Sequence, residues 1–195
     1  MTTDQRVARG ARSRVAITRH AVDVASVEGL SELSIGRLAT DLAMSKSGVA
    51  TLFRSKEQLQ LATIETARQA FLDAVVRPAL DAPQGSARVR ALIERWIAYA
   101  EQPLFPGGCF WAANLPVFDS RPGPVRDALQ RQRQAWLDLL AEQIQHAAHA
   151  GEAIGRDADL TAFHLDAVLT AANTAMRLGE PDAADKVRRL IDELL

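Results

Sequence analysis

The sequence predicts an all-α fold of about nine helices. Apolar residues recur at intervals of three and four along most of the chain, which is the spacing of one helix face, and no stretch keeps the alternation of a strand. Clusters of Gly and Pro interrupt this spacing and divide it into segments of helical length. Of the 195 residues, 48% are hydrophobic, which is ample for a buried core in one large domain or in two smaller ones.

Three helices and the start of a fourth are predicted near the N-terminus. An apolar stripe over residues 17–25 is followed by a glycine, a natural helix stop. Apolar residues next recur at i, i+3, i+4 and i+7 over residues 35–42, and again at i, i+3 and i+4 over residues 49–53. The sequence SKEQ at residues 55–58 has the pattern of a capping box, which begins a long fourth helix.

Five further helices are predicted after the loop DAPQGS at residues 81–86. Two breakers, PLFPGGC at residues 103–109 and DSRPGP at residues 119–124, separate the helices in the middle of the chain. The last two helices follow a polar connector at residues 151–159. Their stripes are rich in Ala, Leu, Val and Ile.

Charge divides the chain in a similar way. We predict an N-terminal domain at residues 1–57, with a flexible arm at residues 1–13, and a C-terminal domain at residues 58–195. Residues 1–60 carry nine Lys and Arg against six Asp and Glu, a net charge of +3, whereas the remaining residues carry 14 and 18, a net charge of −4. This asymmetry indicates either a basic binding surface on an acidic body or a charged, disordered N-terminus.

The stretch SIGRLATDLAMSKSGVATLF at residues 34–53 is either two ordinary core helices or a helix-turn-helix. Ser34 and Ser45 precede the two helices as N-caps. The first turn of the second helix, SKSG at residues 45–48, contains no bulky apolar residue, and the apolar residues come later. A recognition helix needs this division, because its N-terminal residues meet base edges and phosphates while the rest packs against the protein. The stretch therefore predicts a helix-turn-helix that binds DNA.

An ordered set of short motifs spans residues 16–65. A first helix ends at Gly29, Ser-Lys at residues 45–46 begins the recognition helix, Phe53 ends it, and SKEQL follows at residues 55–59. This set resembles the tetracycline-repressor (TetR) family of bacterial transcription regulators. The later segments FPGGCF and RPGPVRDAL are similar to one branch of that family's ligand domains. The resemblance implies an N-terminal three-helix DNA-binding domain and a C-terminal helical domain for ligand binding and dimerisation.

Two places depart from the family pattern. Ala43 stands where the turn of the helix-turn-helix usually has Gly. Ala50, Thr51 and Leu52 stand where the recognition helix commonly carries Tyr followed by His-His, and this removes an aromatic phosphate contact.

The resemblance also implies which side chains meet DNA. Lys46 would donate to a phosphate or a base edge, and Lys56 would clamp a phosphate with help from the helix dipole. Arg9, Arg12 and Arg14 would reach phosphates or an adjacent minor groove. The full predicted DNA-binding set is Ser34, Arg37, Thr40, Ser45, Lys46, Ser47, Gly48, Thr51 and Lys56.

The C-terminal domain is expected to bind a small, largely apolar effector. Its aromatic residues suit an apolar pocket in which a few polar groups orient the ligand, or they form an ordinary core. The candidate ligand-binding residues are Trp96, Tyr99, Phe105, Phe110, Trp111, Asn114, Phe118, Phe163 and His164.

The last two helices are expected to form a homodimer. Small residues such as Ala167, Ala171 and Gly179 permit close helix approach, and Val187 and Leu194 begin and end an apolar stripe. A twofold dimer presents two recognition helices to half-sites about 34–36 Å apart on double-stranded DNA, so the operator should be a rough palindrome. On the family's pattern the protein is a repressor that its effector releases.

Cys109 is the one cysteine of the chain, which excludes an internal disulfide and is compatible with a cytoplasmic location. It is either a buried structural thiol or a redox sensor. A regulator switched by oxidation of Cys109, or by a protein partner, is therefore an alternative to one switched by a ligand.

Other functional classes find little support in the sequence. No motif of a nucleophile elbow, a phosphate-binding loop or a zinc protease is present, so a small all-α enzyme is a weak alternative and no catalytic residue is assigned. His146 and His149 share a helix face without a matching carboxylate or cysteine, so we expect neither a metal nor another cofactor. No signal peptide or apolar run long enough to span a membrane is found.

Overall fold

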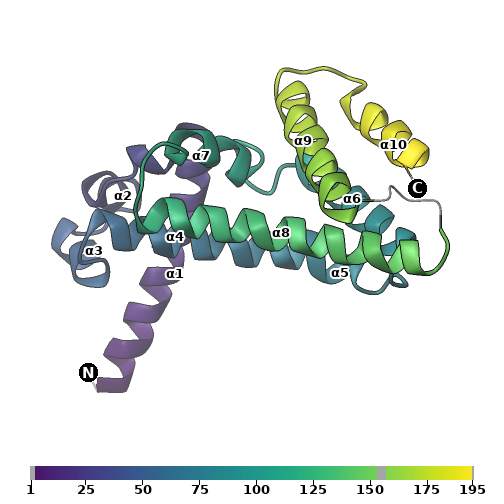
Figure 1. Cartoon of the computed structure of the whole chain (residues 1–195). Helices are drawn as coiled ribbons and strands as arrows, with labels where there is room; N and C mark the ends of the chain where they lie inside the picture. Colours follow the sequence, from purple (N-terminus) through teal and green to yellow (C-terminus); the bar gives the residue numbers. More distant parts are fainter. Residues whose placement is uncertain (1–2, 153–156, 195) are drawn as a thin grey trace. The chain divides into compact units, whose positions relative to one another are not determined.

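The computed structural model describes residues 3–152 and 157–194, which form an all-α fold (Figure 1). This part of the chain contains nine helices when α4 and α5 are counted as one, and no strand, so the predicted fold class is confirmed. The chain divides into two compact units. We call residues 1–69 with 105–129 the N-terminal unit, and residues 70–104 with 130–195 the C-terminal unit.

The N-terminal unit is built around a helix-turn-helix that packs on α1 (Figure 1). Ile17, Leu38, Val49 and Phe53 are fully buried and form its core. Its elements are α1 (Thr3–Glu28), a 3-10 turn (Leu30–Glu32), α2 (Ile35–Asp41), α3 (Lys46–Leu52), most of α4 (Lys56–Phe71), α7 (Phe110–Phe118) and the start of α8 (Pro124–His149).

Two sequence-based expectations about this region differ from the structure. The arm predicted at residues 1–13 is helical where it is described, because α1 begins at Thr3. The predicted boundary at residue 57 also differs from that of the compact units, because the segment 105–129 packs with the N-terminal helices. That packing joins residues about eighty positions apart, so the local apolar spacing carried no sign of it.

The loop before α7 and α7 itself are hydrogen-bonded to the end of α1. Gly107 N donates to Ser26 Oγ at 2.9 Å. Asn114 Oδ1 accepts from Leu30 N at 2.7 Å, and its Nδ2 donates to Ala25 O at 3.1 Å. From the other side, Gln60 Nε2 on α4 donates to Leu30 O at 2.7 Å. The backbone N–H of Leu30 is thus bound by a buried side chain from α7, and its carbonyl oxygen by one from α4.

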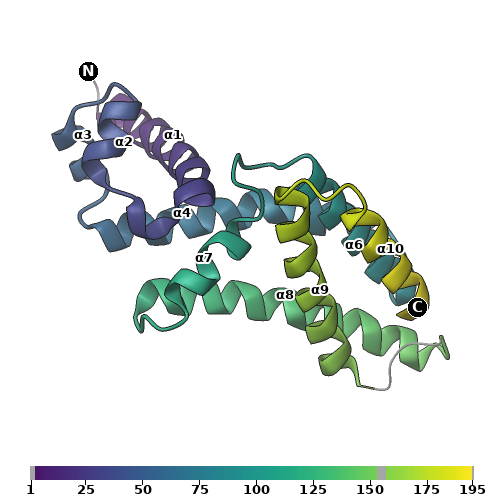
Figure 2. The same cartoon turned by 90° about the horizontal axis from the view of Figure 1, so that it is seen from above.

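The C-terminal unit contains α6 (Ser86–Glu101), most of α8, α9 (Ala158–Arg177) and α10 (Ala183–Leu194). Figure 2 shows α9 and α10 side by side, and α6 contacts both. The helix α4 continues through a π-helical turn (Leu72–Val76) into α5 (Arg77–Ala79). Pro78 has no N–H to donate, so the hydrogen-bond register changes ahead of it.

Loop and helix contacts over long sequence distances stabilise the C-terminal unit. The N-cap of α6 is Gly85, which has no side chain, and the Glu152 carboxylate accepts from Ser86 N at 2.9 Å in its place. Arg188 on α10 pairs with Glu94 on α6 at 3.1 Å. No helix within the described ranges has the length and apolar character needed to cross a bilayer.

Candidate nucleic-acid interface

The turn of the helix-turn-helix has the geometry of a Schellman motif. Ala43 is left-handed, with φ of 51°. Met44 N donates to Ala39 O at 2.8 Å, and Ala43 N donates to Thr40 O at 3.1 Å. The left-handed conformation explains why a glycine is expected here. The turn keeps its shape with alanine at a cost in backbone strain.

Replacing Ala43 with glycine is expected to raise the free energy of unfolding by about 1 kcal/mol, since glycine removes the Cβ strain at positive φ. Chemical denaturation measures the change. Ala50→Gly is the matched control, because Ala50 lies inside α3 and loses about 1 kcal/mol of helix propensity. Equal destabilisation by both substitutions would contradict a left-handed residue at the turn.

Both helices of the motif begin at the predicted serine caps. Ser34 Oγ accepts from Arg37 N at 3.1 Å, and Ser45 Oγ accepts from Gly48 N at 3.1 Å. A Cβ on Gly48 would stand 2.9 Å from Ser45 Oγ, so a larger residue there would require this hydroxyl to shift. Arg37 and Gln58 occupy the equivalent position after Ser34 and Ser55, so the cap by itself does not require glycine.

The helix α3 divides between core and solvent as the sequence predicts. Val49 and the C-cap residue Phe53 are fully buried, whereas Lys46, Ser47 and Thr51 are exposed. Thr51 Oγ1 donates to Ser47 O at 2.8 Å, so this hydroxyl has an acceptor lone pair to offer a ligand rather than its proton.

Arg37, which we predicted to meet DNA, is engaged by two carboxylates of this chain. Its guanidinium makes a two-point contact with Glu28, in which Nη2 and Oε1 are 2.7 Å apart, and its Nε lies 3.5 Å from Asp41 Oδ2. His20 Nε2 on α1 also contacts Asp41, at 2.9 Å. The hydrogen bond from Arg37 lowers the pKa of Glu28, and the one from His20 lowers the pKa of Asp41. This network ties α2 to α1.

The two lysines of the predicted interface lie on the surface. Lys46 is exposed at the start of α3, and its Cε is 3.9 Å from where a Cβ on Gly36 would stand. Lys56 Nζ donates to the carbonyl oxygen of Ser31, although its ammonium has three protons and keeps donors for a phosphate. Ser55 caps α4 by accepting from Gln58 N at 3.1 Å, as the capping-box pattern predicted.

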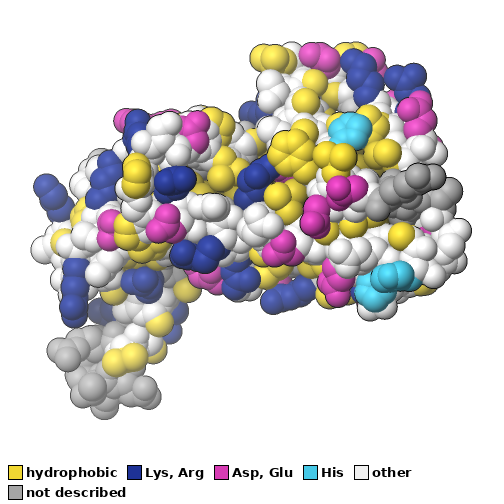
Figure 3. Space-filling view, in the orientation of Figure 1, with side chains coloured by type: hydrophobic (Ala, Val, Ile, Leu, Met, Phe, Trp, Pro, Cys, Tyr) yellow, Lys and Arg dark blue, Asp and Glu magenta, His cyan; other side chains and the backbone are white. Residues whose placement is uncertain are grey.

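Basic side chains surround these helices. Figure 3 shows Lys and Arg, in dark blue, over the first four helices. Arg9, Arg12 and Arg19 on α1 are exposed, as is Arg54 after α3. Arg14, which we expected to reach DNA in the same way, contacts the end of α3 instead.

The predicted ligand-binding residues are divided between the two units. Trp96 and Tyr99 are buried in the C-terminal unit, where the Phe71 ring lies edge-on to Tyr99 and to Trp136, each at 5.5 Å. Phe71 and Trp136, which the sequence presents as ordinary members of apolar stripes, thus form an aromatic cluster with Tyr99. The remaining aromatics before residue 119, namely Phe105, Phe110, Trp111 and Phe118, belong to the N-terminal unit.

Three of the predicted ligand-binding residues have surroundings that differ from those of an enclosed apolar pocket. Phe163 is 54% exposed on α9 and His164 beside it is exposed, so neither lines an interior cavity of this chain. Asn114 is buried, but the backbone of Leu30, Ala25 and Phe110 engages its amide. It is a structural residue. Cys109 is buried at the N-cap of α7.

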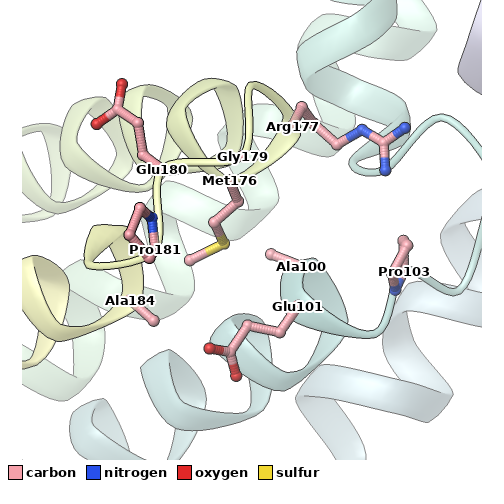
Figure 4. A pocket seen from close by; sticks show the side chains of 9 residues that line it. All are labelled: Ala100, Glu101, Pro103, Met176, Arg177, Gly179, Glu180, Pro181 and Ala184. Carbon is pink, nitrogen blue, oxygen red and sulfur yellow. The ribbon is translucent and has the colours of Figure 1, made fainter.

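A pocket with a volume of about 300 Å³ lies in the C-terminal unit, at the ends of α6 and α9 (Figure 4). Met176 projects into its middle from α9. Ala100 and Pro103 line one side, and Glu101 and Arg177 supply charges of opposite sign. None of these residues was singled out from the sequence, because small and charged side chains at helix ends give no signal for a cavity. Elsewhere, the part of the chain that the structure describes has no group of three His, Cys, Asp or Glu suited to a metal ion.

Comparison with known proteins settles the family. The family model described as the tetracyclin repressor-like C-terminal domain matches residues 85–191, more than half of the chain. The chain belongs to the TetR family. It is a transcription regulator of the helix-turn-helix type, in agreement with residues 34–53. Regulators of this family are DNA-binding proteins, typically repressors and dimers, and not enzymes.

Several solved structures share the fold over more than nine tenths of the chain. A regulator from Chloroflexus aurantiacus is 22% identical, with a TM-score of 0.84 over 94% of this chain and 93% of that one. AibR, in complex with isovaleryl coenzyme A and operator DNA, is 20% identical, with a TM-score of 0.74 over 93% and 97%. A regulator from Saccharomonospora viridis in complex with choline is 17% identical, with a TM-score of 0.75 over 94% and 95%. No curated protein showed a significant sequence match.

Proposed function

We propose that this TetR regulator is a repressor that binds a palindromic operator as a homodimer and is released by a small molecule. The observation that carries the proposal is the exposure of the capped, polar first turn of α3 beside a fully buried Val49 and Phe53. An N-terminal turn of this kind enters the major groove in helix-turn-helix proteins. The AibR complex with operator DNA has the same fold, which supports the comparison.

The decisive experiment is fluorescence anisotropy of the protein with DNA from upstream of its own gene, titrated with salt. Tight, sequence-selective binding that weakens with salt supports an operator-binding regulator. If that DNA binds no better than random DNA, selection from genomic fragments is the next step. Failure to select any sequence would refute the proposal.

Lys46→Ala is expected to weaken operator binding about tenfold and to lower the slope of log Kd against log salt by about 0.9, if Lys46 meets one phosphate. Lys186→Ala is the matched control, because Lys186 lies on α10 and pairs with Asp182, the residue just before that helix. Thermal unfolding checks that both variants keep the wild-type stability. An unchanged Kd for Lys46→Ala would place the interface elsewhere.

An apolar face on α9 supports the homodimer. Leu160 and Phe163 are 63% and 54% exposed, and Ala167 and Ala171 continue the same face. The stripe predicted on α10 does not contribute in the same way, since its Val187 is buried inside its own unit, as is Ile191. The proposed contact therefore lies mainly on α9 rather than equally on the last two helices.

Phe163→Asp is expected to convert the dimer to a monomer at micromolar concentration, because it places a charge at the centre of the proposed apolar contact. Sedimentation equilibrium measures the association. Leu80→Asp, at a residue 44% exposed after α5, is the control and should leave the dimer intact. A dimer that persists in Phe163→Asp would require a different face.

The pocket at the ends of α6 and α9 is the proposed effector site. Its volume of about 300 Å³ is at the lower end of small-molecule sites, and its mixed lining suits a compact ligand with both polar and apolar groups. Structural relatives bound to isovaleryl coenzyme A and to choline support ligand control on this fold. A ligand that favours one of two conformations would shift the population away from the DNA-binding one.

Hydrogen bonds within the N-terminal unit connect α7 to α1, the helix on which the helix-turn-helix packs. The segment that carries α7 belongs to the matched C-terminal region of the family, yet Asn114 and Gly107 hydrogen-bond to α1 and to the turn after it. A displacement of α7 would therefore move the end of α1 directly. Because Gln60 holds the same Leu30 from α4, movement of α4 would act on the same point.

A further inference from the structure

Arg14 lies on α1 against the C-terminal end of α3. Its Nη1 donates to the carbonyl oxygen of Leu52 at 2.9 Å. The centre of its guanidinium lies 4.5 Å from the centroid of the Phe53 ring, which is fully buried. One planar side chain thus contacts both the last residue of α3 and the residue that caps it.

A helix as short as α3 depends on such contacts. It has seven residues, and an isolated helix of that length is not stable in water. Its last carbonyl groups have no partner within the helix, and a cation at this end interacts favourably with the helix dipole. One helix turn before Arg14, a Cβ on Gly10 would stand 3.8 Å from Leu52 Cδ2, so α1 and α3 also approach closely there.

We infer that Arg14 is a positioning residue that sets the angle of the recognition helix by capping its C-terminus from α1. This inference rests on the proposed function, in which α3 reads DNA. The role differs from that of a phosphate contact, which any cation at this place would supply. Arg14 supplies a planar fork that donates to Leu52 while it stacks on Phe53, and lysine does not reproduce this geometry.

Arg14→Lys separates the two roles because it keeps the charge. Its affinity is measured for an operator selected with the wild-type protein and for random DNA of the same length. We expect operator Kd to rise about fivefold to tenfold, with random-DNA Kd and the salt slope unchanged, since non-specific binding depends on charge. Wild-type operator affinity in Arg14→Lys, or an equal loss on both DNAs, would overturn the inference.

Arg189→Lys is the matched control, since Arg189 is an exposed arginine on α10, away from the residues predicted to meet DNA. It should leave the operator-to-random ratio at the wild-type value. If the wild-type protein selects no sequence, the proposed function fails, while the positioning role is still tested by a measurement without DNA. Hydrogen–deuterium exchange should then be faster in α3 of Arg14→Lys and unchanged in α9. Unchanged exchange in α3 would overturn the inference by itself.

Discussion

Gly107→Ala is expected to lower the free energy of unfolding by about 3 kcal/mol, at the upper end of the cost of overpacking. A Cβ on Gly107 would stand 1.9 Å from the carbonyl oxygen of Ser26, 2.1 Å from its carbonyl carbon and 2.6 Å from Val27 N. These are backbone atoms of α1, so no side-chain rotation relieves the clash. The loop must separate from α1 and give up the hydrogen bond from Gly107 N to Ser26 Oγ.

Urea denaturation, followed by circular dichroism, measures this loss. Gly36→Ala is the matched control, because Gly36 lies inside α2 and the nearest atom to a Cβ there is Lys46 Cε at 3.9 Å. In Gly36→Ala we expect the free energy of unfolding to rise by up to about 1 kcal/mol, because alanine has the better helix propensity. A change of less than about 0.5 kcal/mol in Gly107→Ala would mean that the loop does not lie this close to α1.

Asn114→Leu is expected to cost about 3 kcal/mol of unfolding free energy, because a buried donor is left without its partner. The native amide accepts from Leu30 N and donates to Ala25 O and Phe110 O, and it is fully buried. Leucine has a similar volume but makes none of these bonds. Leu30 N loses its acceptor, whereas Ala25 O keeps the bond from Gly29 N at 3.1 Å.

The control for Asn114→Leu is Gln134→Leu on α8, an exposed amide that donates to Asp138 at 2.8 Å. Its effect should stay within about 0.5 kcal/mol, since water replaces the lost bond. The two variants differ in burial and not in the chemistry of the deleted group. An equal loss of unfolding free energy in both variants would show that the buried amide of Asn114 stabilises the fold no more than an exposed amide does.

The helix-turn-helix could be predicted from sequence in detail because its determinants are local. The caps at Ser34, Ser45 and Ser55 each satisfy an N–H three residues further along the chain. The burial of Val49 and Phe53 follows from a four-residue spacing on one face. The anomaly at Ala43 was also visible, since a turn of this kind favours residues that accept positive φ.

The contacts of several candidate site residues could not be predicted, because they depend on distant partners. Arg37 was expected to face DNA, and the structure adds that Glu28, nine residues earlier, binds its guanidinium. Arg14 was assigned the same role as its neighbours on α1, and only the position of Leu52, 38 residues away, distinguishes it. Composition identified Phe163 as a pocket residue, whereas the direction of its face on α9 exposes it.

The fold class, the helix-turn-helix and the family resemblance could be predicted from the residues alone, because helix periodicity and capping act over three to four residues. Three features became apparent only from the packing of the helices: α7 belongs with the N-terminal helices, Val187 and Ile191 of the α10 stripe are buried, and a pocket forms at the ends of α6 and α9. Each of these depends on which helix faces pack together. An amphipathic stripe specifies that a face is buried but not which partner buries it.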